Sequence, residues 1–229
     1  GTNPEIIFSL PIQNYFFPEH EFLDISHIMT PVTIGVMGLN WSKYLGIPLV
    51  GTHHSPLAYY SSAYIPIAGK IMSKTGFLWA WERHIWQKFD LISVPTPSKK
   101  KLLLEHRFFK NPIISLTNGI DDFYFKKVDG TAIREKYNLG DKKVLVYASR
   151  QSPEKNIEKV VKAFKRIHKK IPDSHLLLVG TGPSVQSIKR RIHWYKLQEH
   201  VTQTGYVSDM ELLKIYKAAD VSCLYSWVE

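Results

Sequence analysis

Apolar and polar residues alternate in two rhythms along the chain. Short runs rich in Val, Ile and Leu predict β-strands, and longer stretches with apolar residues three or four positions apart predict α-helices. The predicted strands cover residues 22–28, 47–52, 90–94, 113–116, 143–148, 175–179, 201–204 and 221–224. The predicted helices cover residues 32–45, 63–89, 98–106, 153–170, 185–195 and 209–218. This alternation is typical of α/β folds with parallel, doubly wound sheets.

A polar stretch at residues 121–141 separates two such series. The second series has the clearer pattern, because the run KVLVYA at 143–148 is apolar after its first residue. Continuous apolar strands of this kind are buried on both faces of a parallel sheet. We therefore predict an α/β chain with two Rossmann-like lobes, residues 1–122 and 123–229.

Composition narrows the class of protein. Hydrophobic residues make up 44% of the 229 residues and charged residues 22%, which suffices for a packed core and excludes an intrinsically disordered chain. No apolar run approaches the ~18 residues of a membrane-spanning helix, so none is expected. The single cysteine, Cys223, cannot form an internal disulfide, which is typical of a reducing compartment; we interpret it as a core residue.

The net charge of +10 is unevenly distributed. Residues 1–97 contain five Lys/Arg and six Asp/Glu, whereas residues 150–196 contain twelve Lys/Arg and only three Asp/Glu. Such an asymmetry indicates a polyanionic partner: nucleic acid, an anionic membrane or a phosphorylated substrate. Basic helix faces that are simply solvated explain the pattern equally well.

The loop after strand 143–148 contains the first candidate site. Ligands of parallel α/β sheets bind beyond the carboxyl ends of the strands, and here the residues are Ser-Arg-Gln-Ser-Pro-Glu-Lys. Ser152 and Pro153 suit the start of a helix. Lys155 then falls in the first turn, where a cation is unfavourable unless an anion is bound. We predict that Arg150 and Lys155 bind phosphate; the alternative is a surface lysine screened by solvent.

Two further loops follow predicted strands. Gly180 and Gly182 follow strand 175–179 and would allow a backbone to approach a ligand closely, although a plain tight turn has the same pattern. His53 and His54 follow strand 47–52. Adjacent residues of an extended chain point to opposite sides, so the two histidines are a poor metal pair and no metal site is predicted. One of them could face a ligand while the other is buried.

Taken in order, the segments resemble the family 4 retaining glycosyltransferases, which have the GT-B fold. Each matching segment is short, but together they extend over nearly the whole chain in the family's order. They are residues 24–27, 47–54, 94–98, 117–121 with Phe125, 149–155, 179–183, 201–206, 216–220 and 226–229.

The resemblance implies catalytic roles for four residues. Arg150 and Lys155 would hold the donor diphosphate and stabilise it as it leaves, because cations there offset the developing negative charge. His54 matches the histidine that the family places beside the donor sugar. Glu229 matches the first glutamate of the family's Ser-x-x-Glu segment, which contacts the sugar hydroxyls.

The resemblance also implies the position of the nucleotide. Gly180 and Gly182 would line the nucleotide side of the site, and the backbone near Tyr206 and Val207 would meet the base. Ser226 opens the Ser-x-x-Glu segment and joins this group. No metal and no further cofactor are implied; the nucleotide-sugar donor, UDP-glucose by the resemblance, is itself a substrate.

Two departures from the family pattern concern the ends of the chain. The family's first strand with its glycine-rich loop is absent, and so is the second glutamate of its paired-glutamate motif. We therefore expect a fragment in which both lobes are incomplete.

The acceptor is inferred from the aromatic stretch 59–66 and the tryptophan-rich helix after it, which are similar to bacterial 1,2-diacylglycerol 3-glucosyltransferases. This similarity implies that a membrane lipid such as diacylglycerol accepts the hexose, at the cytoplasmic face of an anionic cell membrane. Trp79, Trp81 and Trp86 could equally be ordinary core residues. Three alternatives remain: a non-lipid acceptor such as a polysaccharide, a non-hydrolysing sugar-nucleotide epimerase, and a basic nucleic-acid-binding module without catalysis.

Overall fold

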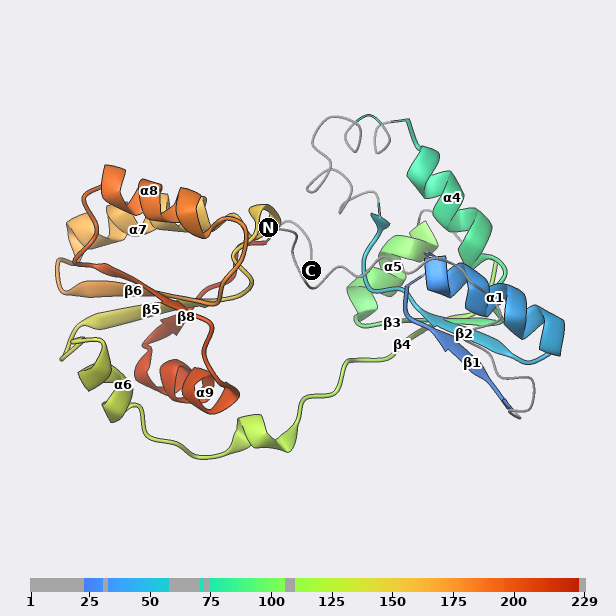
Figure 1. Ribbon diagram of the computed structural model, residues 1–229, viewed down its shortest axis with the longest axis horizontal. Helices are drawn as coiled ribbons and strands as arrows, with labels where there is room; N and C mark the ends of the chain where they lie inside the picture. Colours follow the sequence, from blue (N-terminus) through green and yellow to red (C-terminus); the bar gives the residue numbers. More distant parts are fainter. Residues whose placement is uncertain (1–22, 31–32, 58–70, 72–74, 106–109, 227–229) are drawn as a thin grey trace. The chain divides into compact units, whose positions relative to one another are not determined.

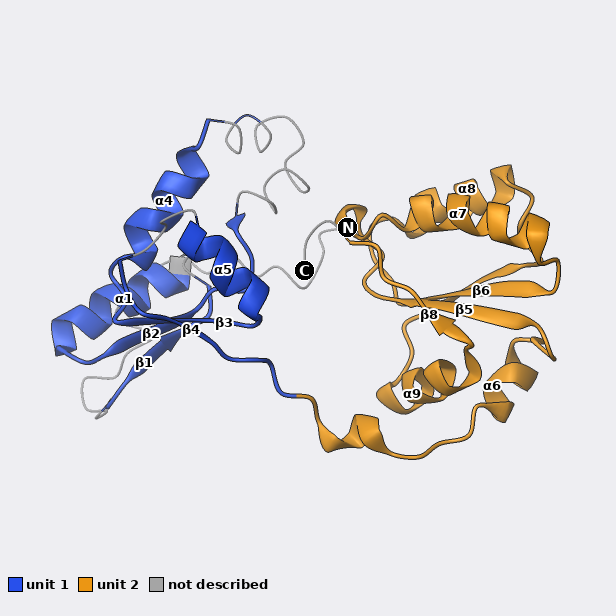
Figure 2. Ribbon diagram, turned by 180° about the vertical axis from the view of Figure 1, so that it is seen from behind, with its two compact units in different colours: residues 1–119 blue, residues 120–229 orange. Residues whose placement is uncertain are grey.

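The computed structural model describes residues 23–30, 33–57, 71, 75–105 and 110–226 (Figure 1). The chain forms two compact units, residues 1–119 and 120–229 (Figure 2). Each unit is an α/β structure around a parallel four-stranded sheet, so the predicted fold class is confirmed.

The sheet of the first unit has the strand order β1-β2-β3-β4. Its strands are β1 (Ser26–Ile28), β2 (Leu49–Thr52), β3 (Leu91–Val94) and β4 (Ile113–Ser115). Its described helices are α1 (Thr33–Leu45), α4 (Phe77–Trp86) and α5 (Pro97–Glu105). The end of α4 packs closely on β2 at Gly51, where an added Cβ would lie 2.5 Å from the Trp86 ring and 2.6 Å from that of Phe89. Trp86 is thus a core residue, with 1% of its surface exposed.

The sheet of the second unit has the strand order β7-β6-β5-β8. Its strands are β5 (Lys143–Ala148), β6 (Ser174–Val179), β7 (Val201–Gly205) and β8 (Val221–Ser222). Its α-helices are α6 (Thr131–Lys136), α7 (Ile157–Lys170), α8 (Val185–Trp194) and α9 (Asp209–Ala218), and its 3-10 turns are η2 (Asp122–Phe125) and η3 (Pro153–Lys155). Figure 1 shows α7 and α8 on one face of this sheet and α6 and α9 on the other.

This strand order has a functional consequence. After β5 the chain adds β6 and β7 on one side, and it then returns to place β8 on the other side of β5. The direction of strand addition therefore reverses between β5 and β8, and open parallel sheets bind their ligands at such a switch point. The fold directs attention to the loops that follow these two strands.

Two predicted helices differ from those observed. The predicted helix 153–170 is wrong at its start, because Pro153–Lys155 form a separate 3-10 turn and Asn156 has a left-handed backbone (φ 49°) before α7 begins. Of the predicted helix 63–89, residues 77–86 are α4, whereas 63–70 and 72–74 lie outside the described residues. No helix in the described part of the chain is long and apolar enough to cross a membrane.

Candidate functional site

Two loops of the second unit are held together by Gln151, whose surface is only 1% exposed. Its backbone N–H donates to the Thr181 carbonyl at 2.8 Å, and its carbonyl accepts from the Ser184 N–H at 2.8 Å. Its side-chain Nε2 donates to the Gly180 carbonyl at 2.9 Å. The loop after β5 and the loop after β6 thus form one hydrogen-bonded layer. Sequence reasoning missed Gln151, because these partners are about 30 residues away and leave no local pattern.

The glycines of the second loop are required by this contact. A Cβ on Gly180 (φ 113°) would lie 2.2 Å from the Ser149 carbonyl oxygen, and one on Gly182 (φ 155°) would lie 2.5 Å from that of Gln151. Any larger residue would force the two backbones apart. The close approach expected at these glycines is therefore to a neighbouring loop, and their contact with a nucleotide stays a prediction.

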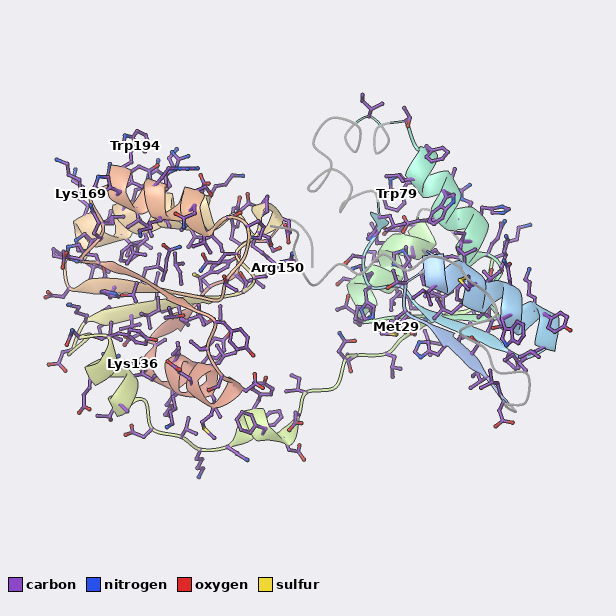
Figure 3. All side chains as sticks on the ribbon, viewed as in Figure 1. Met29, Trp79, Lys136, Arg150, Lys169 and Trp194 are labelled. Carbon is purple, nitrogen blue, oxygen red and sulfur yellow. The ribbon has the colours of Figure 1, made fainter. Side chains whose placement is uncertain are left out.

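Arg150 and Lys155 lie on the first loop, and both are half-buried. Figure 3 shows Arg150 at the edge of the second unit where β5 ends. The carbonyl of Lys155 accepts a hydrogen bond from the buried Tyr147 hydroxyl at 2.7 Å, which fixes the end of η3.

Ser152 and Pro153 occupy the N-cap and first positions as predicted, but those of the 3-10 turn η3 rather than of α7, and Ser152 makes no side-chain cap bond. Its hydroxyl donates instead to the Glu154 carboxylate at 2.5 Å, inside a turn that is only three residues long. Lys155 therefore precedes α7, so the helix-dipole argument for an anion does not apply to it. What remains of the phosphate prediction is two cations on one rigidly held loop beside the switch point.

The loop after β8 meets the loop after β5. Tyr225 donates its N–H to the Tyr147 hydroxyl at 3.3 Å, and the Ser226 hydroxyl donates to the Glu154 carbonyl at 3.4 Å. Ser226 thus lies beside the turn that carries Lys155. Glu229 lies outside the described residues.

The predicted base-binding pair follows β7. Gly180 donates its N–H to the Gly205 carbonyl at 2.9 Å, so this loop adjoins the glycine loop. Tyr206 is 83% exposed, whereas Val207 packs against the core formed with α6 and α9. The second unit therefore brings together seven of the predicted site residues in four neighbouring loops: Arg150, Lys155, Gly180, Gly182, Tyr206, Val207 and Ser226.

His54 belongs to the first unit, directly after β2. It is half-exposed, whereas its neighbour His53 is 1% exposed. The His54 carbonyl accepts from the Lys99 ammonium group and, at 2.8 Å, from the Ser55 hydroxyl. These bonds fix the backbone at His54.

A buried carboxyl group, that of Glu82, contacts the same loop from the interior of the first unit. Glu82 on α4 is 1% exposed; its Oε1 accepts from the Leu57 N–H at 3.0 Å and lies 3.7 Å from His53 Nε2. Burial raises the pKa of Glu82 to about 7. Burial and the charge of Lys99 lower the pKa of His53 to about 4. His53 is therefore uncharged at neutral pH, and the contact is not a full ion pair.

Sequence reasoning also missed Glu82, although a signal was present. It is the one acidic residue in the apolar, aromatic segment Phe77–Trp86. A lone carboxyl group on such a helix is costly to bury without a hydrogen-bond donor, so it indicates a specific partner.

Comparisons with known proteins agree with this architecture. Residues 16–122 match the family model described as Glycosyltransferase Family 4, and residues 129–229 match that described as Glycosyl transferases group 1. Anabaena HepE, solved in complex with UDP, is similar in fold with a TM-score of 0.71 at 18% identity; the match covers 89% of this chain and 53% of that one. Sucrose-phosphate synthase from Thermosynechococcus elongatus has a TM-score of 0.71 at 23% identity, over 90% of this chain and 51% of that one.

Two curated relatives are lipid-modifying enzymes by name. An alpha-monoglucosyldiacylglycerol synthase of Streptococcus pneumoniae is 27% identical over 204 residues, which are 86% of this chain and 45% of the relative. The same-named enzyme of Acholeplasma laidlawii is 26% identical, over 87% of this chain and 52% of the relative. The chain thus spans about half the length of these relatives. With two family matches that together extend over most of its length, the chain belongs to the family 4 glycosyltransferases of the GT-B fold.

Proposed function

We propose that the whole protein is a retaining glycosyltransferase that moves a hexose from a nucleotide-diphosphate sugar to a membrane lipid. The observation that carries the proposal is the layer of loops at the switch point of the second unit, where Gln151 locks together the backbone that carries Arg150 and the glycine loop. A diphosphate is the ligand that suits two cations on a rigid, glycine-bordered loop.

The chemistry follows from where negative charge develops. Breaking the bond between sugar and phosphate leaves charge on the departing diphosphate, and preorganised cations stabilise that charge in the transition state. Arg150 and Lys155 supply the cations. Tyr206 and Val207 meet the base, Ser226 and Glu229 contact the sugar end, and His54 of the first unit lies beside the donor sugar.

UDP-glucose is the proposed donor and diacylglycerol the proposed acceptor. The names of the streptococcal and Acholeplasma relatives support both a glucosyl group and a diacylglycerol lipid. Such an acceptor places the protein on the inner face of the cell membrane as a peripheral protein. A non-lipid acceptor is the second candidate, because an alpha-D-kanosaminyltransferase of Streptomyces kanamyceticus is 25% identical over 73% of this chain.

The donor is tested by calorimetric titration of the whole protein with UDP, GDP and their hexose conjugates. We expect saturable binding of the UDP series, abolished in an Arg150→Ala, Lys155→Ala double variant. The matched control is Arg166→Ala, Lys170→Ala, which removes the same two residue types from exposed positions of α7. Failure of every nucleotide to bind, or an equal loss in both variants, would contradict the proposal.

The acceptor is tested separately. Labelled UDP-glucose is incubated with the whole protein and either diacylglycerol in detergent micelles or soluble sugar acceptors. Label in a solvent-extractable product supports the lipid acceptor, and label only in a water-soluble product supports the second candidate.

A further inference from the structure

The two faces of the second unit's sheet carry very different charge. Helices α7 and α8, on one face, contain nine Lys/Arg residues and a single carboxylate, that of Glu158. Helices α6 and α9, on the other face, contain four Lys/Arg and three Asp/Glu residues. Packing does not explain this asymmetry, because both helix pairs bury a comparable apolar stripe against the same sheet. The excess of cations lies on the solvent side of α7 and α8.

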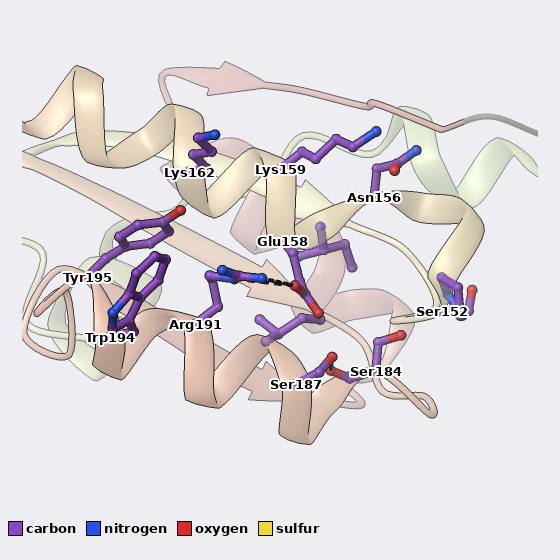
Figure 4. Close-up of a pocket in the computed structure, with 13 residues that line it drawn as sticks. Ser152, Asn156, Glu158, Lys159, Lys162, Ser184, Ser187, Arg191, Trp194 and Tyr195 are labelled. Atoms are coloured by element: carbon purple, nitrogen blue, oxygen red, sulfur yellow. Dashed lines mark hydrogen bonds and ion pairs between the residues drawn. The ribbon is translucent and has the colours of Figure 1, made fainter.

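A pocket of about 740 Å³ lies between these two helices. Glu158 is the sole acid among its described lining residues, and its carboxylate is paired with Arg191 at 2.9 Å. Lys159 and Lys162 line the same pocket from α7. Figure 4 shows the paired Arg191 and Glu158 inside the pocket, with the aromatic residues of α8 at one end. With three cations and one acid among these residues, the lining carries net positive charge.

Aromatic side chains border the cations. Trp194, at the end of α8, is 68% exposed, and the Arg191 guanidinium lies 5.3 Å from its ring. The Lys165 ammonium group lies 4.8 Å from the ring of Tyr195. Tyr195 is half-buried and packs against the core, so Trp194 is the exposed ring of the two. An exposed Trp beside Lys and Arg is typical of surfaces that meet the headgroup region of a bilayer, since the ring occupies the interface while the cations pair with lipid phosphates.

The opposite end of the pocket reaches the proposed donor loops. Ser152, on the loop after β5, and Ser184, on the loop after β6, also line it. Any surface bound over α7 and α8 is therefore next to the loops that carry Arg150 and Gly182. For an enzyme with a lipid acceptor this arrangement is favourable, because a bilayer bound over α7 and α8 holds the acceptor lipid close to the donor loops.

We propose that the α7–α8 face is a docking surface for an anionic lipid bilayer, with lipid phosphates beside the exposed cations Lys162, Lys165, Lys169 and Arg190 and the indole of Trp194 in the headgroup layer. The proposal rests on the lipid acceptor of the proposed function and adds the surface by which the protein reaches it. A nucleic acid also carries phosphates, and it is an outcome of the test.

The test is flotation of the chain with phosphatidylcholine vesicles, with and without phosphatidylglycerol. Four exposed cations of the face are neutralised together: Lys162→Gln, Lys165→Gln, Lys169→Gln and Arg190→Gln. The matched control removes the same charge from elsewhere in the second unit: Lys126→Gln, Lys127→Gln, Lys214→Gln and Lys217→Gln. We expect binding only to phosphatidylglycerol vesicles, and a loss of affinity of about tenfold or more in the first variant, since each cation near an anionic surface contributes several-fold. The control should lose much less, because its cations lie outside the face.

A second readout follows Trp194 itself. Brominated phosphatidylglycerol should quench the chain's tryptophan fluorescence, and Trp194→Phe should remove part of that quenching without preventing flotation. The surface is overturned if the two charge variants lose vesicle binding equally, if wild type does not float with phosphatidylglycerol, or if single-stranded RNA displaces the vesicles through the same four cations. UDP titration of wild type and of the same variants distinguishes the two proposals. If wild type does not bind UDP, the proposed function is contradicted, whereas the docking surface is judged by vesicle binding alone.

Discussion

The two units hold the loops that follow their strands by different means. In the second unit, backbone carbonyls and N–H groups of two loops bond to each other through Gln151, and glycines permit the close approach. In the first unit, the loop with His54 is supported by titratable side chains, Glu82 from α4 and Lys99 from α5. A backbone-held loop is sensitive to added volume and indifferent to pH. A loop held by buried acid and base groups is sensitive to protonation and to the loss of a single side chain.

The largest expected effect concerns volume in the second unit. Gly180→Ala places a methyl group 2.2 Å from the Ser149 carbonyl oxygen at a φ of 113°. We expect a loss of about 3 kcal/mol in the free energy of unfolding, from backbone strain and from separation of the loops. Urea unfolding measures it.

Gly140→Ala is the matched control, since Gly140 has a φ of 51° and nothing within 4 Å of the added Cβ. It should cost about 1 kcal/mol, from backbone conformation alone. Equal losses at the two glycines would show that the loops of the second unit are not in tight contact.

The next effect concerns the buried acid of the first unit. Glu82→Ala removes the acceptor of the Leu57 N–H and leaves a cavity beside His53. We expect a loss of about 2 kcal/mol in the free energy of unfolding, because a buried donor is left without a partner. Glu82→Gln retains an acceptor oxygen in nearly the same volume and should cost clearly less. If the two variants are equally unstable, the hydrogen bond to Leu57 does not support the loop.

A smaller effect tests the side-chain part of the second unit's loop layer. Gln151→Ala removes the bond to the Gly180 carbonyl and the bond accepted from Gln203, but keeps the two backbone bonds of residue 151. We expect a loss of about 1.5 kcal/mol in unfolding free energy. Gln203→Ala, which removes two longer bonds, one of 3.2 Å to the Gln151 side chain and one of 3.4 Å to the Val185 carbonyl, should cost less. A larger loss of unfolding free energy in Gln203→Ala would show that the Gln151 side chain is not the main side-chain contact between the two loops.

The same contrast explains how much could be predicted from the sequence. Strand 143–148 and helix 209–218 were predicted with their observed bounds, because apolar spacing within one element determines them. The start of α7 was not, because contacts of Ser152 and Lys155 with other groups select a 3-10 turn and a left-handed Asn156 over a continuous helix.

For the candidate site, strand-end logic indicated the loops at Arg150, Gly180 and His54. The side chains that hold those loops were missed. Gln151 acts on residues some 30 positions away, and Glu82 acts on Leu57, which is 25 positions away. Such partners are chosen by tertiary packing, which spacing along the chain does not reveal.

The effect that is smallest in the wild-type chain is the pH dependence contributed by the first unit's loop, because two opposing contributions meet there. The pKa of Glu82 is raised to about 7, so the folded state holds a proton that the unfolded state releases, and this contribution to stability is lost as pH rises from about 4.5 through 7. The pKa of His53 is lowered to about 4, so its contribution has the opposite sign: stability is lost as pH falls from about 6.5 through 4. Between about pH 4.5 and 6.5 the two contributions largely cancel in the wild-type chain.

Removing one partner at a time should expose the two slopes. Relative to wild type, Glu82→Gln should gain unfolding free energy with rising pH between about 4.5 and 7, by at most about 1.4 kcal/mol per pH unit. His53→Gln should lose it relative to wild type between about pH 4 and 6.5. Urea unfolding at several pH values measures both, and taking each difference against wild type cancels the other titrating groups, His175 among them. If the unfolding free energies of the two variants change with pH in parallel, Glu82 and His53 do not titrate as a buried pair. The loop of the first unit would then be as insensitive to pH as the loops of the second unit.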